Sequence, residues 1–184
     1  MLEIRYDNDK IKRLERELRG FPKNSLPKVM SRALNRTGTE ARTKVSRVFS
    51  QRLGLKVKDI RERVTLTRAS YRNWRSVVKI SRKRIPLIRF GARETNKGIT
   101  YKKAGERVLI RHAFKATMKS GHTGVFKRKL SARLPISELR GPSLGQVFVS
   151  AQDEANRIYR ESMQRLSKNI HDQVRLILKR RLPA

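Results

Sequence analysis

The spacing of apolar residues changes along the chain, and this change constrains the fold more than any other feature. From Ser25 to Gly54, apolar or small side chains recur every three or four positions, as on one face of an α-helix. Ser25 and Pro27 are typical of a helix start and Gly54 of a helix end, so we expect one long helix between them. The stripe comprises Val29, Ala33, Leu34, Thr37, Ala41, Val45, Val48 and Phe49.

The same helical spacing returns near the C-terminus, after Gly141 and Pro142. Ser143 is a suitable N-cap, and we expect a helix of more than about thirty residues, interrupted by a break. Its stripe comprises Val147, Ala151, Ala155, Ile158, Met163, Leu166, Ile170, Val174, Ile177 and Leu178. Shorter helical segments are predicted at residues 9–19 and 57–64.

Between the helices, short β-branched runs bounded by glycine and charged residues predict strands. They are Ser76–Ile80, Ile85–Phe90, Val108–Ile110, Ala113–Met118 and Gly124–Lys127. Pro86 indicates an edge position or a strand that begins at Leu87. The glycines of Gly121–Gly124 indicate a tight hairpin, because the segment lacks the spacing of a phosphate-binding loop.

The predicted fold class is therefore α+β, with a small, mainly antiparallel sheet flanked by long N-terminal and C-terminal helices. We expect a single domain over residues 1–184, with a helical N-terminal part (1–64), a basic β-rich middle (65–140) and a C-terminal helix (143–184). Helices this long extend beyond so small a sheet. Their surplus apolar faces pack either on each other or on a second copy of the chain, and the second alternative favours an oligomer.

The charge of the chain is strongly unbalanced. Its 184 residues include 47 Lys or Arg and 15 Asp or Glu, a net charge of +32. Residues 61–142 alone hold 23 basic and 4 acidic residues. Since solvated surfaces normally mix both signs, this excess predicts a polyanionic partner that binds the middle of the chain.

The densest basic cluster is Arg82, Lys83 and Arg84. Contacts from such side chains to phosphates would give salt-dependent binding that ignores base sequence. The predicted nucleic-acid contacts are Arg68, Arg72, Arg75, Lys79, Arg82, Lys83, Arg84, Arg89, Lys102, Lys103, Lys127 and Lys129. Two aromatic residues, Tyr71 and Trp74, lie between these basic residues in the sequence and could stack on unpaired bases, although a lone Trp is more often a core residue.

The sequence contains few residues that could form a catalytic site or bind a metal ion. The chain has no cysteine and three histidines, and no Asp or Glu lies between residues 107 and 137, around His112 and His122. Mg²⁺ in a nuclease needs carboxylates, so we expect no enzyme, no metal and no cofactor. No apolar stretch approaches the length of a membrane span, and the first residues lack the apolar core of a signal peptide, so we expect a cytoplasmic origin and no membrane partner.

Several segments occur together, and in order, in one known family. They are residues 30–37, 56–63, 65–70, 77–80, 85–91, 113–114 and 121–128, and the strongest is Leu134–Ser143 (LPISELRGPS). Over most of residues 28–150 the chain resembles the minor tail protein Z family of long-tailed bacteriophages, also called tail completion proteins.

This resemblance implies a non-enzymatic virion protein at the head-proximal end of the tail, assembled in the host cytoplasm and needed to place the genome end. The implied partners are double-stranded DNA and other tail or neck proteins, such as the tail terminator, tail tube and tape measure. A homo-oligomer is implied by analogy with tail-terminator assemblies, with a six-fold ring as the natural symmetry. Two alternatives stay open, namely a ribosomal or RNA-chaperone-like protein and an adaptor that contacts acidic proteins.

Overall fold

The computed structural model describes residues 2–4, 12, 16, 25–103 and 105–179. Apart from residues 12 and 16, the helix predicted at residues 9–19 lies outside the described residues. The chain divides into two compact units. Unit 1 comprises Met1–Val45, Val64–Ile80 and Ala151–Ala184, and unit 2 comprises Ser46–Arg63 and Ser81–Ser150. The single domain expected over residues 1–184 stays a prediction.

The two long helices form where the apolar stripes predict them. They are α2 (Ser25–Leu53) and α5 (Gln152–Lys179), and the predicted break falls at Ala151, after the short helix α4 (Leu144–Ser150). Gly54 follows α2 with φ of +64°, a left-handed conformation that glycine adopts without strain. Two shorter helices of the described residues are α3 (Val57–Arg61) and the 3-10 helix η1 (Leu87–Phe90).

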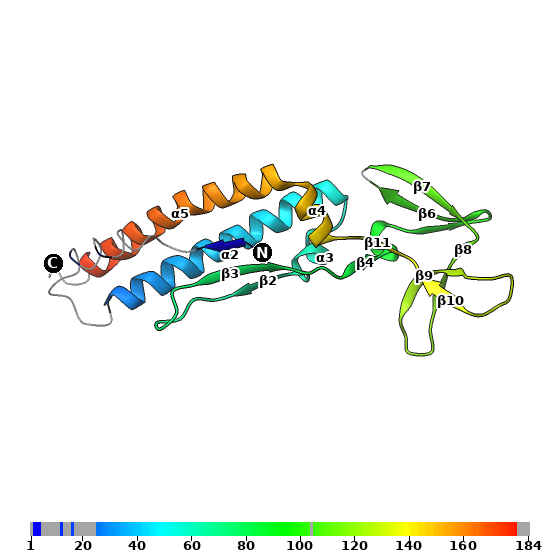
Figure 1. Ribbon diagram of the computed structural model, residues 1–184, viewed down its shortest axis with the longest axis horizontal. Coiled ribbons are helices and arrows are strands. Elements are labelled where there is room, and N and C mark those ends of the chain that lie inside the picture. The colour runs from blue at the N-terminus through cyan, green and yellow to red at the C-terminus, as the bar shows by residue number, and fades with distance from the viewer. Residues whose placement is uncertain (1, 5–11, 13–15, 17–24, 104, 180–184) are drawn as a thin grey trace. The chain divides into compact units, whose positions relative to one another are not determined.

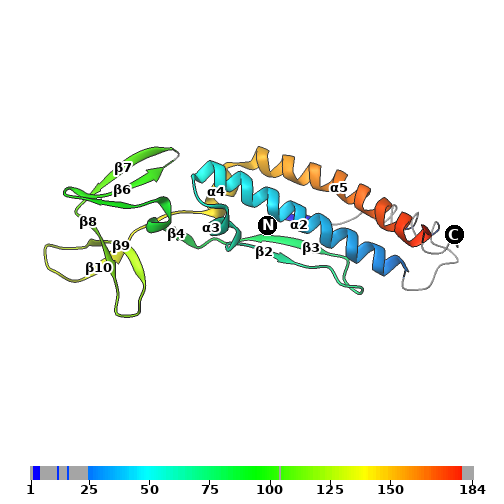
Figure 2. The ribbon, with the colours of Figure 1, turned by 180° about the vertical axis from the view of Figure 1, so that it is seen from behind.

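Unit 1 is built on an antiparallel sheet with the strand order β1 (Leu2–Ile4), β3 (Ser76–Ile80), β2 (Val64–Thr67). Within this unit, α2 and α5 lie side by side along the sheet (Figures 1 and 2). The predicted apolar stripe of α2 is buried, with Val29, Ala33, Leu34 and Val45 each at most 1% exposed. The helices are joined by a buried hydrogen bond of 2.9 Å that Asn169 Nδ2 donates to Thr37 Oγ1.

Unit 2 combines small antiparallel sheets with the end of α2 and with α3, η1 and α4. One sheet has the order β5 (Arg93–Thr95), β6 (Gly98–Lys103), β7 (Glu106–Arg111), and another has β10 (Ile136–Glu138), β9 (Thr123–Arg128), β8 (Ala113–Thr117). A third pairs β11 (Arg140–Ser143) with β4 (Arg84–Pro86). The core of this unit includes Phe49, Ile60, Ile85, Ile99 and Leu144, each at most 1% exposed. The predicted α+β class, with antiparallel sheets between long helices, is confirmed.

Two local predictions need correction. The strand expected at Ile85–Phe90 is interrupted, since β4 ends at Pro86 and η1 follows. Pro86 has no N–H to donate, although the N–H of Leu87 still donates to the carbonyl of Leu139 at 3.0 Å. The chain then turns into η1, which buries Leu87 and Phe90 together, three residues apart. The helix expected at 57–64 ends at Arg61, because Val64 already pairs with Ile80 in the sheet of unit 1.

The hairpin predicted around Gly121–Gly124 is present between β8 and β9. Gly121 has φ of +78°, and the N–H of Met118 donates to the carbonyl of His122 at 2.8 Å. Lys127 and Arg128 are adjacent in β9 and therefore point to opposite faces.

Candidate nucleic-acid interface

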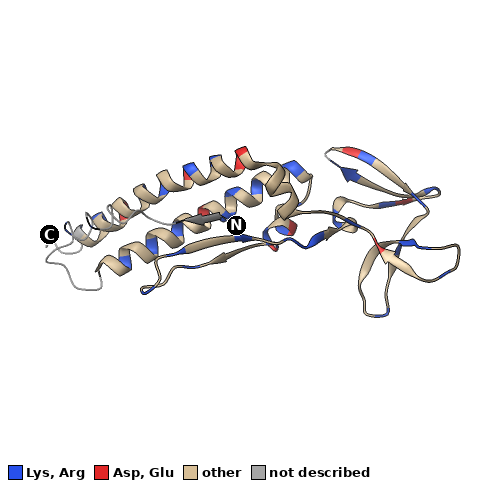
Figure 3. Cartoon of the chain, in the orientation of Figure 1, with Lys and Arg blue, Asp and Glu red and all other residues tan. Residues whose placement is uncertain are grey.

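The two units divide the predicted DNA contacts between them. Arg68, Arg72, Arg75 and Lys79 belong to unit 1, and the other eight residues of the set belong to unit 2. All are exposed except Arg75, which is half-buried. Figure 3 shows Lys and Arg on the helices and strands of both units, with few Asp or Glu among them.

Unit 2 has the greater excess, with 23 Lys or Arg and 5 Asp or Glu in its residue ranges. Two of these acids are already neutralised within the unit. Asp59 is buried and accepts a hydrogen bond of 2.6 Å from Arg89 Nη1. Arg89 is therefore paired with a carboxylate of the protein, although half of its side chain stays exposed, and this pairing weakens its candidacy as a DNA contact.

The second neutralised acid is Glu138, which joins three segments of unit 2. Its Oε1 lies 2.9 Å from His122 Nε2, and its Oε2 accepts bonds from Arg140 Nε and Nη2 at 3.0 and 2.8 Å. Burial by itself raises the pKa of Glu138, but the hydrogen bonds from Arg140 and His122 outweigh it and hold the pKa below its ordinary value of 4.5. The basic excess of unit 2 is thus left largely uncompensated.

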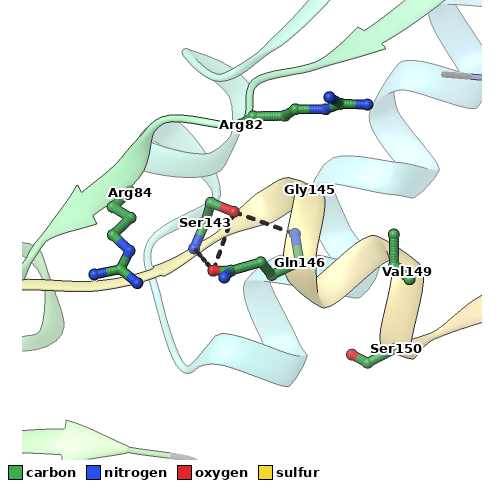
Figure 4. Close-up of a pocket in the computed structure, with 7 residues that line it drawn as sticks. All are labelled: Arg82, Arg84, Ser143, Gly145, Gln146, Val149 and Ser150. Atoms are coloured by element: carbon green, nitrogen blue, oxygen red, sulfur yellow. Dashed lines mark hydrogen bonds between the residues drawn. The ribbon is translucent and has the colours of Figure 1, made fainter.

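Part of the densest basic cluster lines a groove of about 550 Å³. Arg82 and Arg84 form one wall, and Ser143, Gly145 and Gln146 from the start of α4 form another. Figure 4 shows the start of α4 lying between the two arginine side chains. Lys83, between them in sequence, is exposed but does not line the groove.

Strand pairing brings these distant segments together. Ser143 of β11 is the register partner of Arg84 of β4. At position 145 a side chain would crowd Arg82, because a Cβ on Gly145 would lie 3.1 Å from Arg82 Cγ. Glycine at this position therefore allows the stem of Arg82 to lie against α4.

The start of α4 is held by a reciprocal capping box. The N–H of Gln146 donates to Ser143 Oγ at 3.2 Å, and the N–H of Ser143 donates to Gln146 Oε1 at 3.1 Å. The Ser143 N-cap was predicted, whereas the role of Gln146 was missed, although the S-x-x-Q spacing signals it.

The remaining walls of the groove include Ser150 and Val149, whose side chain is 72% exposed. No acidic residue lines the groove. Two guanidinium groups beside an exposed aliphatic side chain are suited to binding phosphates or an acidic polypeptide.

In unit 1, the predicted contacts Arg68 and Arg72 lie in the loop between β2 and β3. Asn35 of α2 holds this loop, since its Nδ2 donates to the carbonyl of Ala69 at 3.0 Å and its Oδ1 accepts from the N–H of Ala69 at 2.7 Å. Trp74 is half-buried and its Nε1 donates to the carbonyl of Tyr71 at 3.0 Å, while Tyr71 is 59% exposed. Trp74 thus shapes the loop, and Tyr71 is presented to solvent.

The other predicted residues lie on two hairpins of unit 2. Lys102 and Lys103 lie at the end of β6, and Lys127 and Lys129 lie at and just after the end of β9. Arg128 has a different environment, because its guanidinium carbon lies 6.0 Å from the centre of the Phe114 ring. The sequence patterns did not indicate this aromatic partner.

The described residues offer no arrangement for catalysis that we recognise. Among them, no three His, Asp or Glu side chains lie close enough to hold a metal ion. Glu138, which follows the stretch 107–137 that contains no Asp or Glu, does contact His122. Its carboxylate is also bound by Arg140. None of the described helices combines the length and apolar character that crossing a membrane requires.

The fold thus defines a class of small, basic α+β protein with an exposed cationic groove. The sequence matches the model of the family described as prophage minor tail protein Z (GPZ) over residues 11–180, so the chain belongs to this family. The predicted family is confirmed, and with it a structural role in a phage tail. No curated protein and no solved structure matches the chain.

Proposed function

We propose that this chain acts as a tail completion protein at the head-proximal end of a phage tail, where its basic surface contacts the end of the genome. The observation that carries the proposal is the uncompensated charge of unit 2, where Arg82 and Arg84 line a groove free of acidic residues. The chain belongs to a minor tail protein family, and a phage genome is a polyanion that a tail protein can meet. Contacts to backbone phosphates suit a protein that must bind DNA of any base sequence.

The proposal is tested by measuring the affinity for duplexes of unrelated sequence over a range of salt concentrations. We expect similar affinities for all sequences and a steep, linear fall of log K with log salt concentration. Replacing Arg82, Lys83 and Arg84 by Gln should reduce the magnitude of the slope by about 2 to 3, since each lost phosphate contact removes about 0.9.

A matched control replaces Arg160, Lys168 and Arg175 of α5 by Gln, which removes the same charge from exposed positions outside the proposed set. This variant should keep the wild-type slope to within about one contact. Equal slopes for the two triple variants, or no DNA binding by the wild type, would contradict the proposal.

The proposal extends to assembly. We infer that the protein resides in the virion and contacts other tail or neck proteins, such as the tail terminator, tail tube or tape measure, as a homo-oligomer matching the six-fold symmetry of a tail. Mass measurement of the protein alone and after mixing with purified tails checks this inference. A chain that stays monomeric and unbound in both samples would contradict it.

A second candidate is an adaptor that contacts an acidic neighbouring protein. The exposed Val149 favours it, because an aliphatic side chain in the groove has no role in phosphate binding. Val149→Ser should then weaken binding to tails while leaving DNA affinity unchanged. If Val149→Ser changes neither, this candidate is wrong.

A further inference from the structure

A second hollow in unit 2 differs in character from the groove beside α4. It encloses about 520 Å³ next to the turn between β5 and β6 and the start of β8. Its polar lining includes Lys97, His112, Arg128, Thr95, Asn96 and Ser131, and no acidic residue. It shares no lining residue with the first groove.

The backbone around this pocket adopts two uncommon conformations. His112 has φ of +58°, which few residues other than glycine adopt, and its N–H donates to the carbonyl of Lys97 at 3.4 Å. Gly98 has φ of +138°, and a Cβ there would collide with the carbonyl of Ile110. A non-glycine residue in the left-handed region, such as His112, is strained, and such residues concentrate at binding sites, where the surrounding structure holds them in place.

Arg128 is positioned by its aromatic neighbour. Residues 126 and 128 lie on the same face of β9, and Phe114 is the register partner of Phe126 on β8. The guanidinium lies 6.0 Å from the Phe114 ring centre, within the range of a cation–π interaction. Phe114 itself lines the pocket, so this contact holds the guanidinium at the pocket wall.

We propose that this pocket binds a phosphate group. The planar guanidinium of Arg128 can donate two parallel hydrogen bonds to phosphate oxygens, and the ammonium of Lys97 supplies a second positive charge. The amide of Asn96 and the hydroxyl of Ser131 can donate further hydrogen bonds. The volume is in the range of pockets that hold small organic ligands, so it accommodates a phosphate with an attached nucleoside.

The phosphate could come from a DNA end or from a free nucleotide, and the chemistry of recognition is the same. The first source rests on the proposed function, because it requires that the protein meets DNA. Affinity for the phosphate group itself does not depend on that function.

Inorganic phosphate is the direct probe. The chain has three histidines, His112, His122 and His171, whose imidazole resonances can be followed by NMR in the full-length protein. At constant pH and ionic strength, phosphate should shift the His112 resonance saturably and leave the other two unchanged. Arg128→Gln should weaken this response at least about fivefold, whereas Arg133→Gln, an equal loss of charge in a nearby exposed loop, should not.

A second variant guards against a folding defect, since Arg128→Gln also removes the contact with Phe114. Lys97→Gln changes an exposed turn residue and should weaken phosphate binding, with Lys119→Gln as its matched control. The proposal is wrong if all three histidine resonances respond alike, or if neither Arg128→Gln nor Lys97→Gln weakens the response.

The source is identified with duplexes that differ only in carrying a 5′-phosphate or a 5′-hydroxyl. Tighter binding of the phosphorylated duplex, lost in Arg128→Gln, assigns the pocket to a DNA end. Equal affinities, together with a saturable response to inorganic phosphate, assign it to a free phosphate or nucleotide. Absence of DNA binding would contradict the proposed function alone, and absence of the phosphate response would contradict the pocket alone.

Discussion

Gly38 is the residue at which close packing outweighs helix propensity. It lies in the middle of α2 in unit 1, where an added Cβ would collide with Ser76 Oγ and lie 2.9 Å from Leu66 Cδ1. Ser76 is fully buried, so the collision cannot be relieved by moving into solvent. A helical glycine is therefore required for α2 to approach the sheet.

Gly38→Ala tests this close approach. In an exposed helix the substitution would stabilise the protein by about 1 kcal/mol, but here we expect a net loss of about 1 to 3 kcal/mol from overpacking. Denaturant unfolding measures the difference. Adding Ser76→Ala, which removes the colliding oxygen, should restore part of the loss, and an increase in stability for Gly38→Ala alone would contradict this account.

At the scale of elements, the carboxylate of Glu138 joins the β8–β9 turn, through His122, to the segment that follows β10, through Arg140. The β9–β10 pairing is short, since β10 has three residues, so a side-chain connection of this kind contributes noticeably to its stability. The connection requires the ionised carboxylate, because Arg140 can only donate hydrogen bonds.

This predicts acid sensitivity with a defined sign. The pKa of Glu138 lies below its ordinary value of 4.5 in the folded protein, so the stabilisation is present above that value and is lost as pH falls through the folded pKa. Thermal melts between about pH 6 and pH 3 should show a stability component that Glu138→Gln lacks. Glu106→Gln, an exposed acid of β7, should keep it, and identical pH profiles for wild type and Glu138→Gln would contradict the prediction.

At the scale of the whole molecule, the net charge of +32 opposes folding through repulsion among like charges. Salt shortens the range of this repulsion, from about 14 Å near 0.05 M to a few ångströms near 0.5 M. We therefore expect the melting temperature to rise by several degrees with sodium chloride over this range. Sucrose at equal osmolality separates screening from general solvent effects, and a melting temperature that falls or stays constant with salt would contradict the expectation.

The local features of the protein follow from its sequence. The stripes of α2 and α5 and the β8–β9 hairpin were predictable, because each depends on the spacing of residues close together in the chain. A break in the C-terminal helix was expected, but its position at Ala151 was not. Six strands of the described residues were missed, because their pairing depends on partners elsewhere in the chain and most of them have only three or four residues. They are β1, β2, β5, β6, β10 and β11.

The candidate sites, in contrast, were decided by tertiary structure. Composition showed that unpaired positive charge gathers in residues 61–142, and the family resemblance indicated a phage tail. Only strand pairing placed Ser143 opposite Arg84, and only packing engaged Arg89 with Asp59 and set Arg128 beside Phe114. Charge excess is a sum over residues and can be read from the sequence, whereas the direction and partners of each cation depend on contacts between segments far apart along the chain.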